Sequence, residues 1–330
     1  MERPRFDAIM AGARECRIVV LGDVMLDRYV EGTVDRISPE APVPVVTVTR
    51  EWDAVGGAAN VAANVRTLGA ECELVGVVAD DEAGGRIGDF LREAGVGHRF
   101  VADGDRPTTA KTRVLAKSQQ VVRVDRERGG AVSAETAGRL LDEVRASLDG
   151  AHALIFEDYN KGVLTPEVIR GALGQARELD VPTVVDPKWE NFFAYGGATV
   201  FKPNRKELTG AMGEPVRPDD VDWLDSARRR LGCTHLLLTL GADGMVLLSP
   251  GPELARARAA ARAVYDVSGA GDTVSATFTV ALAAGATHAE AMTLATHAAA
   301  AAVGKTGVAT VDPEEIWESL TDTSSSTGSP

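Results

Sequence analysis

The sequence predicts an α/β fold in which helices cover both faces of a mostly parallel sheet. Short apolar runs alternate with helix-like patterns along most of the chain, as in parallel strands joined by crossover helices. The first of these runs, residues 17–23, has the apolar character of a buried strand. With 330 residues, 45% of them hydrophobic, the chain can form one large domain, or one domain with a small appendage.

The predicted elements follow one another in a regular order. Strands are expected at residues 17–23, 72–78, 153–157, 183–186, 199–201 and 235–240. Helices lie between them, and the first two are expected at 58–68 and 84–94, ended by Gly69 and Gly95. Because ligands of such sheets bind at the carboxyl ends of the strands, the residues that follow each strand are candidates for a site.

Two segments depart from this alternation. Residues 29–52 contain three prolines and are expected to be extended, and residues 109–126 alternate in two arms around a polar centre, as a hairpin does. Together they could form a small β layer that projects from the main sheet as a lid or a dimer surface. Two long edge loops are the alternative. Residues 321–330 have no apolar content and are expected to be disordered.

The bulk composition is that of an ordinary soluble enzyme. A net charge of −13 argues against nucleic acid or an acidic membrane as the main partner, so an anionic substrate would need a local cluster of Lys and Arg. The three cysteines are widely spaced and the five histidines are scattered, which favours reduced thiols and gives no sign of a zinc site. Neither a signal peptide nor a membrane-spanning run is visible, and the expected compartment is the cytoplasm.

Residues 266–273, Asp-Val-Ser-Gly-Ala-Gly-Asp-Thr, are the most informative stretch of the chain. The strand-like run 261–265 leads into them, and an apolar helix starts at Asp272. Unpaired N–H groups and the helix dipole attract anions at such a start, while a carboxylate in the same turn can take a proton from an attacking hydroxyl. This combination predicts a kinase of small molecules. The alternative is a glycine-rich strand-to-helix connection with an acidic first turn.

Two common nucleotide-binding motifs do not match. A dinucleotide fingerprint at this turn would need a glycine where Val274 stands. A P-loop ending at residues 304–306 would need a glycine where Ala299 stands, and the run before it is helical rather than a strand.

Four further groups of polar residues and glycines fall at predicted strand ends, and three of them have a plain structural alternative. Asp23 and Asp27 could bind sugar hydroxyls or only keep a loop soluble. The paired glycines 56–57 with Asn60 could approach a ligand closely, or could cap and pack the next helix.

The other two groups suggest a nucleotide. Asn204 and Glu207 share one helix face and could hold hydrated Mg²⁺, with a lysine of the same segment near a phosphate; a capped helix start is the alternative. Residues 239–244 place two glycines at a strand end, where they could flank a nucleotide.

Taken together, segments 22–27, 56–60, 204–207, 239–244 and 269–272 resemble the ribokinase-like (PfkB) sugar kinases, over residues 15 to 315. The resemblance implies a three-layer α/β/α sandwich with a mostly parallel central sheet and a small β-sheet lid. The kinase domain would span residues 1–320, with the lid at about 29–52 and 109–126. Segments 22–29, 36–46 and 56–62 are similar to those family members that phosphorylate the anomeric hydroxyl of D-glycero-β-D-manno-heptose 7-phosphate, for ADP-heptose and lipopolysaccharide synthesis.

The resemblance also implies a role for each matching residue. Asp272 would be the catalytic base, and the backbone of Gly269, Ala270 and Gly271 would hold the transferring phosphoryl group. The residues near ATP would be Asn204, Arg205, Lys206, Glu207, Thr239, Gly241 and Gly244, with Asn204 and Glu207 holding Mg²⁺ through water. The sugar side would be formed by Asp23, Asp27, Gly56, Gly57 and Asn60, with Lys111, Arg113 and Lys161 as candidate cations for the 7-phosphate.

Some expectations concern departures and partners. Lys202 stands where a hydroxyl residue is expected in this subgroup, and Ser268 where threonine is usual. The sequence contains no H-x-G-H nucleotide-transfer signature, so a separate nucleotidyltransferase is expected to act downstream. A homodimer through the β lid is also expected, and the sequence leaves open whether a monovalent cation binds near Asp266. The alternatives are a kinase of ribose, fructose or fructose phosphate, and a non-catalytic protein that binds a sugar or nucleotide.

Overall fold

The centre of the fold is a sheet of nine strands, counted over the residues that the structure describes. The computed structural model describes residues 1–116, 119–251, 254–260, 264–305 and 307–324. The strands of this sheet are β1 (Arg17–Gly22), β4 (Glu71–Val78), β5 (Gly97–Ala102), β8 (Ala153–Glu157), β9 (Thr183–Asp186), β10 (Val200–Phe201), β11 (His235–Thr239), β12 (Met245–Leu248) and β13 (Leu254–Ala257). They lie in the order β13-β12-β11-β10-β9-β8-β1-β4-β5, and all neighbours are parallel except β11 with β12 and β12 with β13. The predicted, mostly parallel sheet is confirmed.

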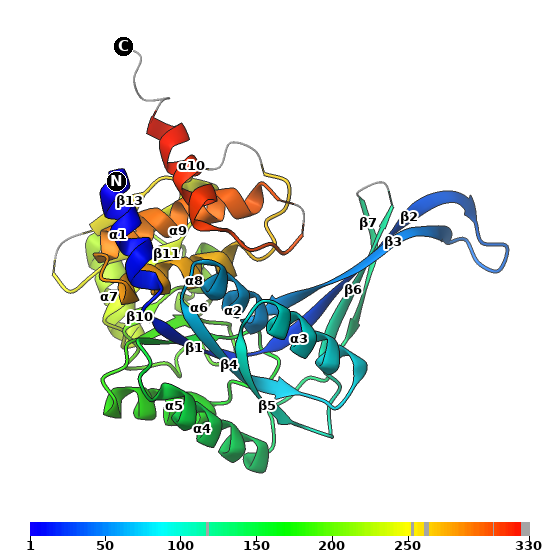
Figure 1. Ribbon diagram of the computed structural model, residues 1–330, viewed down its shortest axis with the longest axis horizontal. Helices are drawn as coiled ribbons and strands as arrows, with labels where there is room; N and C mark the ends of the chain where they lie inside the picture. Colours follow the sequence, from blue (N-terminus) through cyan, green and yellow to red (C-terminus); the bar gives the residue numbers. More distant parts are fainter. Residues whose placement is uncertain (117–118, 252–253, 261–263, 306, 325–330) are drawn as a thin grey trace.

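Helices cover this sheet on both faces. They are α1 (Arg3–Ala13), α2 (Ala58–Thr67), α3 (Glu82–Glu93), α4 (Ala134–Leu148), α5 (Pro166–Glu178), α6 (Arg205–Met212), α7 (Val221–Leu231), α8 (Ala270–Ala283), α9 (His288–Val303) and α10 (Pro313–Ser324). Because side chains alternate along a strand, Ile18 and Val20 of β1 pack in one core with α1, α2, α3, α8, α9 and α10. Val19 and Leu21 pack in a second core with α4 to α7 on the other face. The three-layer arrangement is therefore confirmed (Figure 1).

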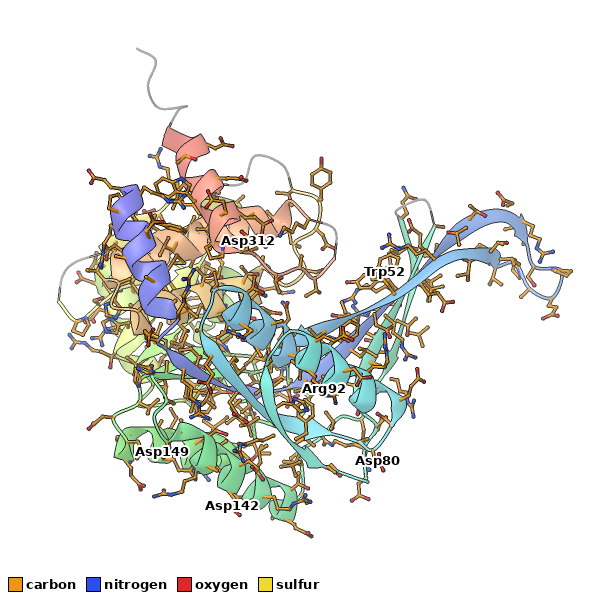
Figure 2. The ribbon with its side chains drawn as sticks, viewed as in Figure 1. Trp52, Asp80, Arg92, Asp142, Asp149 and Asp312 are labelled. Carbon is orange, nitrogen blue, oxygen red and sulfur yellow. The ribbon has the colours of Figure 1, made fainter. Side chains whose placement is uncertain are left out.

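A second, four-stranded sheet projects from the main body (Figure 1). Its strands are β2 (Val24–Ile37), β3 (Pro44–Gly57), β6 (Thr109–Ala116) and β7 (Gln119–Arg126), in the order β3-β2-β6-β7. Figure 2 shows Trp52 on the arm formed by β2 and β3, where its ring stacks on Tyr29 at 4.9 Å between centroids. The predicted β layer is confirmed, and the alternative of two edge loops is wrong.

Some local expectations need correction. β2 begins at Val24, so Asp27 lies on a strand rather than on a loop after β1. Strands β5, β12 and β13 were not predicted. In the run 261–265, residues 261–263 lie outside the described residues, and Val264 and Tyr265 are not in a strand.

The end of the chain also differs in part from the expectation. Helix α10 continues to Ser324, into the segment 321–330 that the sequence predicts to be disordered, and residues 325–330 lie outside the described residues. Among the described helices, none combines the length and apolar character needed to span a membrane.

Candidate active site

The candidate site is a cavity of about 580 Å³ at the carboxyl ends of the strands, beside the start of α8. Its wall includes most of the residues that the sequence places at the glycine turn and the nucleotide, namely Asn204, Glu207, Thr239, Gly241, Gly244, Gly269, Ala270, Gly271 and Asp272. Within the described part of the chain, Arg205 and Lys206 do not form part of this wall. Both are exposed on α6, and Arg205 pairs with Asp243.

Asp272 is held at the inner end of the cavity. Gly269 begins α8 in the left-handed conformation, with φ of 77°, and Asp272 lies in the first helical turn. The carboxyl group is buried; its Oδ2 accepts a hydrogen bond from Asn60 Nδ2 at 2.8 Å and its Oδ1 accepts one from Tyr159 Oη at 2.7 Å. Burial raises the pKa of this carboxyl to about 6, against the lowering effect of the two hydrogen bonds. A group with this pKa can accept a proton near neutral pH.

Glycine is required at position 269 for a second reason besides its backbone conformation. A Cβ atom there would lie 2.9 Å from Asn60 Nδ2, the group that orients Asp272. The first-turn N–H groups of α8 point out of the helix, beside Asp272. The turn could therefore hold an anion next to an oriented carboxylate.

Asp23 holds a loop rather than pointing toward the cavity. Its buried carboxylate accepts hydrogen bonds from the backbone N–H groups of Tyr159, Lys161 and Val163, at 2.8, 3.0 and 3.2 Å. Because these contacts use both carboxylate oxygens, the side chain fixes the loop that follows β8. The same loop carries Tyr159, which reaches Asp272.

The predicted sugar side lies between β2, the end of β3 and β6. Asp27 is buried and pairs with Arg113, which lies on the neighbouring strand β6. A Cβ on Gly56 would lie 2.5 Å from Asp27 Oδ2, so any other residue at position 56 would displace this carboxylate. Gly57 has φ of 58°, and a Cβ there would lie 2.5 Å from the carbonyl oxygen of Asp23.

The three candidate cations for a substrate phosphate differ in their pairing. Arg113 is bound to Asp27, and Lys161 pairs with Glu127 at 2.7 Å. Lys111 forms no ion pair with any described residue; its ammonium lies 3.1 Å from Met25 Sδ and 5.6 Å from the centre of the Tyr159 ring. Burial lowers the pKa of Lys111, the cost expected for a cation without a bound anion.

The predicted nucleotide side includes the start of α6. Asn204 accepts a hydrogen bond from the Glu207 N–H, and Glu207 Oε2 accepts one from the Asn204 N–H, both at 2.8 Å. The capped helix start that the sequence left open is therefore present. The second oxygen of Glu207 pairs with Lys188 at 2.7 Å. Asn204 and Thr239 are aligned in a short parallel bridge between the neighbouring segments.

The sequence did not assign roles to several residues that line or support the cavity. Tyr159, Asp186 and Lys188 line it, and Glu157 lies close to Asp186 and Asp272. Lys202, from the segment in which the sequence predicts a lysine near a phosphate, lines it too. All follow or end β8, β9 or β10, so their position at strand ends was the available signal.

Glu157, Asp186 and Asp272 form a buried cluster of carboxyl groups. One oxygen from each lies within 4.8 Å of the others. Lys202 Nζ binds Asp186 Oδ2 at 2.8 Å, whereas neither carboxyl oxygen of Glu157 has a hydrogen-bond partner among the described residues. Burial, and then the charges of Asp186 and Asp272, raise the pKa of Glu157 well above its usual value.

Comparison with known proteins shows the family of the chain. Residues 16–315 match the model for pfkB family carbohydrate kinases, and the chain belongs to this family. It is similar to "Bifunctional protein HldE" of Geobacter sulfurreducens, with 42% identity over 97% of this chain and 66% of the relative. A protein of the same name from Caulobacter sp. is 44% identical over 91% of this chain and 62% of the relative. The chain thus spans less than two thirds of the length of these relatives.

Solved structures with low sequence identity share the fold. Escherichia coli phosphofructokinase-2, in its tetrameric inhibited form, has a TM-score of 0.79 and 20% identity over 94% of this chain and 99% of its own. Arabidopsis thaliana ribokinase, solved with ribose and ATP, has a TM-score of 0.71 and 22% identity over 92% of this chain and 98% of its own. The ribokinase-like fold predicted from the sequence is confirmed.

Proposed function

We propose that this protein transfers the γ-phosphoryl group of ATP to the anomeric hydroxyl of D-glycero-β-D-manno-heptose 7-phosphate, in the cytoplasm. The observation that carries the proposal is the buried Asp272 carboxyl, oriented by Asn60 and Tyr159 at the glycine turn beside the cavity. Membership of the carbohydrate kinase family supports the reaction type. The choice of a heptose phosphate is supported by the resemblance of segments 22–29, 36–46 and 56–62.

The proposed reaction assigns one step to each part of the site. The anomeric oxygen bonds to the γ-phosphorus, the bond from that phosphorus to the bridging oxygen of ADP breaks, and the hydroxyl proton passes to Asp272. A positioned base contributes a factor of about 10²–10⁴ in rate. Backbone N–H groups of residues 269–271 would hold the phosphoryl oxygens, a contribution of the kind worth about 10²–10³ for one donor.

For Mg²⁺, the donor set fits binding through water rather than direct coordination. Both Asn204 and Glu207 line the cavity, but their side chains already take part in the helix cap and in the pair with Lys188. Their oxygens retain lone pairs for hydrogen bonds from the water molecules that Mg²⁺ keeps. When bound, Mg²⁺ would neutralise part of the charge on the ATP phosphates. A monovalent cation would lie near Asp266, whose oxygens accept hydrogen bonds from the N–H groups of Ser268 and Gly307.

For the substrate phosphate, Lys111 is the best-supported of the three candidate cations. Arg113 and Lys161 already have carboxylate partners, whereas the partly buried Lys111 has none among the described residues. An anion at this position would relieve the unfavourable burial of its charge. In the proposed complex, Asp27, Gly57 and Asn60 lie near the sugar hydroxyls, and Asp23 supports them through the loop after β8.

For assembly, we propose a homodimer through the projecting sheet. Every residue of β7 is exposed, and Val121, Val122 and Val124 are among them. An exposed apolar edge strand is a surface that a second copy can cover. Light scattering would report the dimer mass, and Val122→Lys with Val124→Lys should shift it to the monomer. Downstream of the kinase, we propose a separate nucleotidyltransferase as the next enzyme.

A coupled assay for ADP release tests the kinase proposal. The panel contains the heptose 7-phosphate, ribose, fructose and fructose 6-phosphate, each with ATP and Mg²⁺. The highest kcat/KM is expected with the heptose phosphate. A higher kcat/KM with another sugar of the panel would show that the proposed substrate is wrong. If none of the sugars causes ADP release, a non-catalytic binding protein is favoured.

A further inference from the structure

Lys202 is a buried cation next to the glycine turn. It follows β10, is 3% exposed and forms part of the cavity wall. Its Nζ lies 3.7 Å from the position that a Cβ on Gly271 would take, and Asp186 Oδ2 lies 3.6 Å from the same point. Since residues 269–271 form the proposed phosphoryl site, the ammonium group stands beside the place where the γ-phosphate would enter.

The surroundings of Lys202 leave part of its hydrogen-bonding capacity unused. An ammonium group has three donors, and Asp186 is its one ion-pair partner among the described residues. A buried lysine is costly unless it is paired and hydrogen-bonded, and nearby Glu157 adds two more buried oxygens that have no partner in the described part of the chain. A purely structural ion pair would be expected to complete these bonds. That the described residues do not complete them points to a site that is completed by a ligand.

The other lysine of the cavity is differently placed. Lys188 pairs with Glu207 and lies 5.2 Å from the centre of the Tyr159 ring, so its charge is already matched at the start of α6. Lys202 is the lysine next to Gly271.

We propose that Lys202 is a further catalytic residue, whose ammonium group donates hydrogen bonds to the transferring phosphoryl oxygens. This inference rests on the proposed kinase reaction. As the bond to the sugar oxygen forms and the bond to ADP breaks, negative charge on the phosphoryl oxygens is held between Lys202 and the backbone of residues 269–271. Lys202 keeps its proton throughout, and the hydroxyl proton goes to Asp272. Asp186 positions the ammonium group before ATP binds.

The test compares two variants that differ only in this ammonium group. Lys202→Met alone would leave Asp186 as an unpaired buried charge, which destabilises folds strongly. We therefore compare Asp186→Asn with the double variant Asp186→Asn/Lys202→Met, checking thermal unfolding of both. Rapid quench at saturating ATP and sugar gives the rate constant of phosphoryl transfer, and calorimetry gives ADP affinity.

The rate constant of the double variant should be lower than that of Asp186→Asn by about 10²–10³, as for loss of one preorganised donor. Since ADP lacks the transferring group, its affinity should change by less than about threefold, which is under 1 kcal/mol. Lys202→Arg, which keeps the charge, should retain more of the rate. Arg145→Met, the loss of one positive charge on the outer helix α4, should leave both quantities unchanged.

Three failing outcomes can be distinguished. If the wild-type protein releases no ADP with any sugar of the panel, the kinase proposal fails before the variants are compared. If the wild type is active and the double variant transfers phosphoryl as fast as Asp186→Asn, only the role of Lys202 is refuted. A parallel loss of ADP affinity and rate would assign Lys202 to nucleotide binding instead and overturn the inference.

Discussion

Replacing Tyr159 with phenylalanine should move the acid limb of the pH–activity profile to higher pH. The Tyr159 hydroxyl donates to Asp272 Oδ1 at 2.7 Å, and this hydrogen bond favours the ionised carboxylate, the form that is proposed to act as the base. Without it, the pKa of Asp272 rises, because burial already favours the protonated form. Activity should therefore be lost at pH values where the wild type still works, and should be retained at alkaline pH.

The size of the shift follows from the strength of the lost bond. A hydrogen bond to a charged group is worth about 1.5–3 kcal/mol. One pKa unit corresponds to about 1.4 kcal/mol, so the bond accounts for about one to two units. Asn60 still donates to Oδ2, and water can replace part of the lost bond, so we expect a rise of about one unit from the starting pKa of about 6.

The assay is kcat/KM for the sugar phosphate as a function of pH, by ADP release. Tyr195→Phe is the matched control, because the buried Tyr195 hydroxyl also donates to a carboxylate, Asp158 Oδ2 at 2.8 Å, but does not touch Asp272. Its acid limb should coincide with that of the wild type. An unchanged acid limb in Tyr159→Phe, or an equal shift in both variants, would refute the assignment of Asp272 as the titrating base.

Three other predictions address the base, the substrate phosphate and the fold. Asp272→Asn should lower turnover by about 10²–10⁴ while ATP affinity measured by calorimetry stays near that of the wild type; near-normal turnover would exclude it as the base. Lys111→Met should raise KM for the sugar phosphate by about 10–100-fold and leave KM for ATP unchanged, since a charge-assisted hydrogen bond is worth about 1.5–3 kcal/mol; equal effects on both substrates would contradict its role. Gly57→Ala should reduce the free energy of unfolding, measured by denaturant titration, by more than about 1 kcal/mol, because φ is 58° there and the new Cβ would lie 2.5 Å from a carbonyl oxygen. Gly129→Ala is the control and should be nearly neutral, since its Cβ would meet nothing within 4 Å.

The parts of the fold that the sequence predicts are those with a strong local signal. The apolar runs of β1, β4, β8, β9 and β11 could be found because each is bounded by glycine, proline or a helical pattern. β5 and β13 lie at the two edges of the sheet and carry polar residues, so their pattern is weak. β12 is apolar, but it follows directly on Gly244, within the glycine-containing segment that ends the strand before it.

The geometry of the candidate site could be predicted where its residues also have a local structural role. The glycine turn and Asp272 have a visible local pattern, and the capping pair Asn204 and Glu207 has one too. Partners that are distant in sequence could not be predicted. The bond between Asn60 and Asp272 joins residues 212 positions apart, and no local pattern around Asp23 shows that its acceptors are filled by the backbone of the 159–163 loop.

The contact between Asp23 and the 159–163 loop links the predicted sugar side to Asp272, the proposed base. Asp23 fixes the backbone of Tyr159, and the hydroxyl of Tyr159 fixes Asp272. Asn60, at the start of α2, fixes the other carboxyl oxygen, and it can approach only because position 269 is glycine. Asn60 from the N-terminal part of the chain, and Tyr159 from a central loop that Asp23 holds, thus determine the orientation of a carboxyl group in the C-terminal part. The carboxyl is therefore orientated before any substrate binds, which is the condition under which a positioned base lowers a reaction barrier.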